Sequence, residues 1–396
     1  MTTTSFTGLF IVAAIAFAAP LLLGFAPRLR VPAVVLEIVA GIVVGPSVLR
    51  LVQIDPPIAV LSMLGLAFLL FLAGLEIDIE CLAGPTLRIA TASLALSFAL
   101  GLAVGYAAFA AGLVKAPLFL AIVLLTTSLG LLVPVLKDAG QSRSAFGQFV
   151  IASASMADFA AVLLLSLFSS REAGSVSTKI ALSIGFLACV ALLVATLRRA
   201  ERFSWLSEAL ARLQDTTAQI RVRGAIVLLT GLVAIAVHVG VELLLAAFMA
   251  GAVLSLIDKD DAMSHPQFRT KLEAIGFGFL IPIFFVASGV QFSLGSLFAS
   301  PLALLKVPVF LLGKLVVRGI PAGLYVRMLG PRFAAAAGFF QATSLPFIVA
   351  ATQIGLALGV IQESTASAFV AAGLISVICF PAIGLALIRG HAPERG

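Results

Sequence analysis

The sequence predicts an all-α polytopic membrane protein that crosses the bilayer about thirteen times. Three observations lead to this fold class: 61% of the 396 residues are hydrophobic, only 11% are charged, and the apolar residues stand in long unbroken runs. Soluble domains carry about 25% charged residues, so this chain has too few charges to cover a globular surface. The strands of a membrane β-barrel alternate in polarity over about 10 residues, so the unbroken runs exclude a barrel.

Sustained hydrophobicity between short charged loops, rather than helical periodicity, marks the expected spans. We predict thirteen of them, at residues 8–26, 32–52, 57–77, 86–112, 116–138, 146–170, 177–198, 222–238, 240–257, 272–291, 302–327, 333–358 and 363–388.

The basic residues predict the topology. If residues 222–257 form two helices, most of the 25 Lys and Arg residues fall on one side of the membrane, whereas one long helix would move the last of them to the other side. Cytoplasmic loops carry the excess of Lys and Arg. We therefore predict two helices, an external N-terminus and a cytoplasmic C-terminus. Because Arg28 and Arg30 follow the first apolar run and no basic residue precedes it, we expect a retained helix rather than a cleaved signal peptide.

Topology also explains the net charge of +7, so neither a nucleic acid nor an acidic partner is needed. The expected partners are membrane lipid and small cations, and the expected location is the inner or plasma membrane. Cys81, Cys189 and Cys379 stand far apart, with no Cys/His cluster in the sequence. A disulfide scaffold or structural metal site is therefore not expected.

The chain divides into two halves. Six segments lie in residues 1–170 and six in residues 222–390, while 171–221 holds a linker helix and an amphipathic cytoplasmic stretch, and 391–396 forms a cytoplasmic tail. Pairing each segment with the one seven places later turns the second copy upside down. This is the inverted-repeat arrangement of many secondary transporters.

The fifth and twelfth segments share a polar sequence near mid-membrane. Leu125–Gly130 reads LTTSLG, with Pro134 beyond it, and Gln341–Pro346 reads QATSLP. Proline removes a backbone donor and can free carbonyls for a cation, and paired interruptions point to a transport site. Two ordinary proline kinks are the alternative. The candidate ion ligands here are Thr126, Thr127 and Ser128, and the residues of the second broken helix are Gln341, Thr343 and Ser344.

A few charged residues stand deep in the apolar segments, where each costs about 2.5–3.5 kcal/mol. Asp158 lies at the midpoint of 146–170, Lys314 lies at the midpoint of 302–327 with Arg318 one turn later, and Glu37 lies near one end of its span. Asp158 and Lys314 could form a buried ion pair, but such pairs are often no more stable than apolar replacements.

Asp158 has a chemical use in transport. Burial favours the protonated form of a carboxyl group and a nearby cation favours the ionised form, so the group can exchange a proton for a metal cation. Na⁺ prefers oxygen ligands, and Ser155 shares a helix face with Asp158. Lys314 is a proton-releasing partner, a counter-charge or a structural cation for the broken-helix dipoles. Arg318 stays charged and is structural, and Glu37 faces a neighbouring helix or a funnel.

Three motifs resemble the monovalent cation/proton antiporter-2 family, which carries the sodium/hydrogen exchanger domain. They are PAVVLEIVAGIVVGP at 32–46, FLLFLAGLEID at 68–78 and PIFFVASG at 282–289. The resemblance runs along nearly the whole chain. It implies a homodimer, crossed discontinuous helices and an elevator movement in which Asp158 binds Na⁺ or K⁺ and H⁺ in turn, with a role in pH homeostasis.

The chain departs from this family in two places. Ala157–Asp158 replaces the usual Asp-Asp or Asn-Asp pair, and Gln341–Thr343 lacks the Glu often found there. In the family, a single acid accompanies exchange of one cation for one proton, so we predict electroneutral exchange.

Two other functions stay open. One is a sodium-coupled symporter of an organic anion with a related fold, and the other is an ion-sensing membrane protein that does not transport. An enzyme is not expected, because the sequence contains no Ser/His/Asp arrangement, HExxH motif or Gly-rich phosphate loop. No cofactor is expected either.

Overall fold

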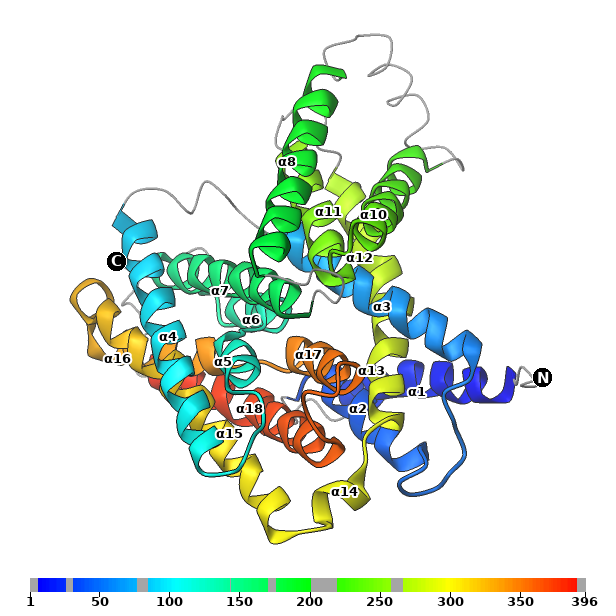
Figure 1. The fold of residues 1–396 in the computed structure, drawn as a ribbon, viewed down its shortest axis with the longest axis vertical. Helices are drawn as coiled ribbons and strands as arrows, with labels where there is room; N and C mark the ends of the chain where they lie inside the picture. The colour runs from blue at the N-terminus through cyan, green and yellow to red at the C-terminus, as the bar shows by residue number, and fades with distance from the viewer. Residues whose placement is uncertain are drawn as a thin grey trace. The chain divides into compact units, whose positions relative to one another are not determined.

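The computed structural model describes residues 6–25, 31–76, 85–142, 144–169, 176–200, 219–257 and 266–389. All the regular secondary-structure elements of these residues are helices, which confirms the predicted fold class (Figure 1). The elements in chain order are α1 (Phe6–Phe25), α2 (Ala33–Val44), α3 (Pro56–Leu75), α4 (Pro85–Ala110), α5 (Pro117–Leu125), α6 (Leu129–Asp138), α7 (Ala145–Ser169), α8 (Val176–Ala200), α10 (Ile220–Val239), α11 (Leu243–Ile257), α12 (Pro266–Ile275), the π-helix η2 (Gly276–Leu280), α13 (Ile281–Val290), α14 (Leu294–Phe298), α15 (Pro301–Gly319), the 3-10 helix η3 (Ile320–Tyr325), α16 (Val326–Ala342), α17 (Pro346–Ala357) and α18 (Glu363–Arg389).

Apolar helices of membrane-spanning length dominate the chain. In the described part, seven helices are long and apolar enough to cross a bilayer, and three shorter apolar helices accompany them. The predicted pair at 222–257 is present, because α10 ends at Val239, Gly240 adopts a left-handed φ of 78° and α11 begins at Leu243. The count of about thirteen spans and the inverted repeat stay predictions.

Some expectations fall on residues outside the described ranges. They concern Arg28 and Arg30, Cys81, most of the amphipathic stretch in 171–221, and the tail 391–396.

Two of the predicted spans are interrupted near their middle. α5 ends at Leu125 and α6 begins at Leu129, so residues 126–128 form the first break. α16 ends at Ala342 and α17 begins at Pro346, so residues 343–345 form the second break. Pro346 opens α17, where a missing N–H costs nothing. Pro134 lies inside α6 instead, so proline is not the cause of the first break.

The helices group into two compact units. Unit 1 holds the described residues within Met1–Ser62, Asp78–Ala161 and Pro282–Gly396, and unit 2 holds those within Met63–Ile77 and Val162–Ile281. Both helix breaks lie in unit 1. This grouping follows packing and is separate from the expected repeat boundaries, which stay a prediction.

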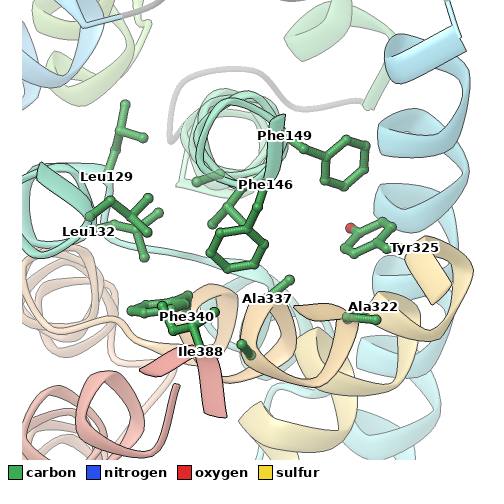
Figure 2. Packing of buried hydrophobic residues seen from close by; sticks show 14 residues of the cluster. Leu129, Leu132, Phe146, Phe149, Ala322, Tyr325, Ala337, Phe340 and Ile388 are labelled. Carbon is green, nitrogen blue, oxygen red and sulfur yellow. The ribbon is translucent and has the colours of Figure 1, made fainter. Parts of the chain in front are cut away.

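Within unit 1, α15 packs against α4, α5, α16 and α18, and α16 and α17 both pack on α18 (Figure 1). An aromatic cluster lies beside the breaks. Figure 2 shows Phe146 and Phe149 of α7 facing Phe340 of α16 and Tyr325 at the end of η3, with Phe149 and Tyr325 in edge contact at 4.4 Å between ring centroids. The helices that carry the two breaks are therefore fixed by close packing.

Within unit 2, α3 and α11 cross in close contact through glycines. Gly74 lies against the carbonyl group of Phe248, and Gly251 lies against the carbonyl group of Phe71. A Cβ at either glycine would overlap the facing backbone, which cannot move as a side chain can. Small residues at such crossings let membrane helices approach closely.

We predict that Gly251→Ala destabilises the protein by about 1–3 kcal/mol, because the added methyl group forces the two backbones apart. Thermal unfolding in detergent measures the effect. Gly231→Ala in α10 is the matched control, since nothing lies within 4 Å of a Cβ there. Equal unfolding temperatures for the two variants would contradict the close crossing.

Candidate functional site

Asp158 caps the first helix break from a neighbouring helix. It lies in α7, and only 7% of its surface is exposed. Its Oδ1 accepts the N–H of Thr127 at 3.0 Å, and its Oδ2 accepts the N–H of Leu129 at 3.3 Å. The first N–H groups of a helix have no partner inside the helix, and they carry the positive end of its dipole. The start of α6 therefore stabilises negative charge at Asp158.

The two breaks lie against each other and satisfy each other's polar groups. The N–H of Ser128 donates to the carbonyl of Thr343 at 3.0 Å. The hydroxyl of Thr127 donates to the carbonyl of Gln341 at 2.9 Å. These bonds replace the helical hydrogen bonds that each chain segment loses at its break, as buried backbone groups require.

Thr126 joins the breaks through its side chain. Its hydroxyl donates to the carbonyl of Val123 at 2.8 Å, so its oxygen acts as an acceptor toward other groups. One of these is the hydroxyl of Ser344, at 3.0 Å. The threonine thus bonds to its own helix and to the opposite break at once.

Two buried cations from α15 bind the first break. Lys314 Nζ donates to the carbonyl oxygen of Thr126 at 2.6 Å and to its Oγ1 at 3.0 Å. Thr126 is the C-cap of α5, so the ammonium group lies at the negative end of that helix dipole. A structural cation would make this contact, and the other two roles expected for Lys314 stay open.

Arg318 lies one turn further along α15 and is almost completely buried. Its Nε donates to Thr127 Oγ1 at 3.1 Å, and its Nη1 donates to Ser97 Oγ of α4 at 3.3 Å. Among the described residues, no ion pair joins Asp158 to Arg318 or Lys314. The alternative of a buried Asp158–Lys314 pair is therefore not seen, and the carboxylate is held by backbone N–H groups instead.

The other predicted site residues occupy different surroundings. Ser155 lies on the buried face of α7, and its hydroxyl donates to the carbonyl of Ile151 at 3.0 Å. The hydroxyl of Thr343 donates to the carbonyl of Phe339 in the last turn of α16 at 3.1 Å. Glu37 is buried on α2, and in the described part of the chain no hydrogen bond joins it to the residues around Asp158.

A buried tyrosine belongs to the site although the sequence did not indicate it. The hydroxyl of Tyr325 contacts Ser93 Oγ, lies 3.1 Å from Ser153 Oγ and lies 3.2 Å from the amide nitrogen of Gln341. The backbone carbonyl of Gln341 accepts from Thr127, so Tyr325 fixes a residue of the site from its other side. The spacing of Ser93 and Ser97 by one helical turn on α4 was the available signal for a polar helix face.

Comparisons with known proteins identify relatives of this chain. The family model described as "Sodium/hydrogen exchanger, transmembrane" matches residues 13–386. YjbQ of Bacillus subtilis, designated a candidate Na⁺/H⁺ antiporter, is 33% identical over 96% of this chain and 63% of its own length. GerN of Bacillus cereus, named a Na⁺/H⁺-K⁺ antiporter, is 26% identical over 67% of this chain and 66% of its own length. The matched segments thus span about two thirds of the length of each of these two relatives.

The fold agrees as well. The structure of the sodium proton antiporter MjNhaP1 from Methanocaldococcus jannaschii superposes with a TM-score of 0.63 at 15% identity, and the match covers 96% of both chains. The family match and the fold are those of secondary transporters, not of enzymes. The chain is a multi-pass membrane protein that belongs to the sodium/hydrogen exchanger family.

Proposed function

We propose that this protein exchanges a monovalent cation, Na⁺ or K⁺, for H⁺ across the membrane, with Asp158 binding the two in turn. The observation that carries the proposal is a single buried carboxylate at a helix break, held by two backbone N–H groups and by no ion pair among the described residues. The names of the relatives support cation/proton antiport, and GerN supports K⁺ alongside Na⁺.

The oxygen atoms around Asp158 suit an alkali cation. Each carboxylate oxygen accepts one N–H and keeps further lone pairs. Ser155, one turn earlier on α7, directs its proton to Ile151, so its oxygen is left as an acceptor. Hard cations prefer such carboxylate and hydroxyl ligands. We infer that Asp158 and Ser155 supply side-chain ligands, while Thr126, Thr127 and Ser128 build the break that positions them.

A single carboxylate also supports electroneutral exchange. Ala157 is fully buried beside Asp158 and offers no second acid. The site is equally charged when Asp158 carries a proton and when it carries one monovalent cation. If Lys314 and Arg318 keep their charges throughout, both loaded forms cross the membrane without moving net charge. The exchange then follows the two ion gradients and needs no cofactor.

The remaining inferences concern assembly. We infer a homodimer in lipid, with an elevator movement of the site and with repeats at 1–170 and 222–390. The placement of Lys and Arg supports a cytoplasmic C-terminus and an external N-terminus.

We predict that Asp158→Asn abolishes exchange, because an amide cannot alternate between a proton and a cation. Proteoliposomes with a trapped pH dye report proton movement after Na⁺ or K⁺ is added. Glu273→Gln is the matched control, since this exposed carboxylate pairs with Arg269 outside the site. Normal proton flux in Asp158→Asn would reject the assignment of the carrier.

The same assay distinguishes the other functions. A Na⁺ flux that requires an organic anion and leaves the pH unchanged would select the symporter. Saturable binding of Na⁺ without flux would select the ion-sensing protein.

We predict competition between H⁺ and Na⁺ at one site. Below the pH at which Asp158 becomes protonated, the apparent KM for Na⁺ rises by up to about tenfold per pH unit, because binding the cation requires release of the proton. The maximal rate stays constant, and it does not change when the membrane potential is clamped at different values. A rate that follows the clamped potential would contradict one-for-one exchange.

We predict that Lys314→Met destabilises the folded protein without changing the number of Na⁺ ions exchanged per H⁺. The substitution leaves the Thr126 carbonyl without its charged donor, which costs about 1.5–3 kcal/mol of stability. Thermal unfolding and the Na⁺/H⁺ ratio are measured on the same preparation. A changed ratio would show that Lys314 carries a transported proton.

A further inference from the structure

The second helix break is bound by a residue of α18 that the exchange chemistry does not use. Ser376 is fully buried. Its Oγ accepts the N–H of Ser344 at 3.3 Å and lies 3.1 Å from the carbonyl oxygen of the same residue. The hydroxyl also reaches the carbonyl of Gly373 in its own helix at 2.7 Å. One side chain therefore contacts both backbone groups at the centre of the break.

Gly373 lets α18 approach the break this closely. A Cβ at this position would lie 3.0 Å from Leu345 Cδ1 and 3.3 Å from the carbonyl oxygen of Ser344. These distances are shorter than ordinary van der Waals contact, so a side chain here would push the break away from Ser376. Gly373 and Ser376 together form a seat for residues 343–345.

Ser376 binds the second break in a way similar to that in which Asp158 binds the first: each side chain accepts a backbone N–H of the break. Asp158 lies 31 residues after Thr127, whose N–H it accepts, and Ser376 lies 32 residues after Ser344, whose N–H it accepts. Each residue stands on the helix that follows its broken helix. In the expected inverted repeat these two helices correspond, and the two residues differ in charge, one acidic and one neutral. The first binds backbone and ion, whereas the second binds backbone alone.

The position of Ser344 matters to the ion site through a short chain of contacts. The hydroxyl of Ser344 bonds to Thr126 Oγ1 at 3.0 Å, and Thr126 in turn accepts from Lys314. The adjacent carbonyl of Thr343 accepts the N–H of Ser128 in the first break. A shift of the second break therefore moves the segment whose N–H groups hold Asp158.

We propose that Ser376 and Gly373 are positioning residues for cation binding, because they hold the second break against the first and so set the geometry at Asp158. This inference rests on the proposed exchange function. Neither residue touches the transported ion. Their loss acts on how tightly the cation is bound, not on whether Asp158 can carry it.

Ser376→Ala and Gly373→Ala test the proposal in proteoliposomes, with the wild type alongside. Each variant is expected to raise the apparent KM for Na⁺ about threefold to tenfold, as the loss of one buried hydrogen bond allows. The maximal rate should stay within about twofold of the wild type. Ser376→Thr, which keeps the hydroxyl, should restore the KM. Ser169→Ala is the matched control, because the buried Ser169 bonds within its own helix, to the carbonyls of Leu165 and Ser166, and to no other residue in the described part of the chain.

Hydrogen–deuterium exchange at 343–346 gives a readout that does not depend on transport. In Ser376→Ala the backbone N–H groups of these residues should take up deuterium faster than in the wild type and in Ser169→Ala. Faster deuterium uptake together with an unchanged KM for Na⁺ overturns the positioning role. A change in the maximal transport rate alone overturns it as well. If the wild type moves no cation, the proposed function fails and the positioning role in exchange fails with it. In that case, faster deuterium uptake in Ser376→Ala still shows that Ser376 holds the second break in place, and unchanged uptake shows that it does not.

Discussion

Backbone groups at a break in a membrane helix cannot be left without partners, because the bilayer core offers no water to bind them. In this protein the two breaks meet, and each supplies partners to the other. Ser128 donates to Thr343, and Thr127 donates to Gln341. The groups that the breaks cannot pair are taken by side chains from outside, with Asp158 on one break and Ser376 on the other. The positions of Asp158 and of the residues in the two breaks follow from these hydrogen bonds.

The same need for partners at the first break determines where the charged side chains bind. The C-terminal end of α5 and the N-terminal end of α6 face each other across the first break with opposite partial charges. Lys314 binds the negative end and Asp158 binds the positive end, so each charged group is bonded to the backbone, and no salt bridge joins the two among the described residues. A direct ion pair would tie the carboxylate to a permanent partner. Holding the charges on separate helix ends leaves Asp158 available for the exchange that we propose.

The helices and the two breaks could be predicted from the sequence, whereas two of the residues that support the breaks could not. Hydropathy located the helices, and the shared Thr-Ser-Leu runs located both breaks, because polar residues are conspicuous in apolar segments. Proline was a poorer guide, since Pro134 lies inside α6. Tyr325 and Ser376 were missed because serine and tyrosine are tolerated in membrane helices for many reasons. Their roles depend on contacts with residues such as Ser153 and Ser344, which lie 172 and 32 positions away and leave no local pattern.

Ala157 shows how the crossing is held without a second polar residue at the carboxylate. A polar side chain at this position would be one way to support the breaks, yet Ala157 is completely buried and offers none. Side chains of α15 support the breaks instead, since Lys314 bonds to Thr126 and Arg318 bonds to Thr127. If Lys314 and Arg318 keep their charges, Asp158 is the one acid beside the breaks in the described part of the chain. In the proposed exchange, that single group limits each cycle to one proton or one monovalent cation.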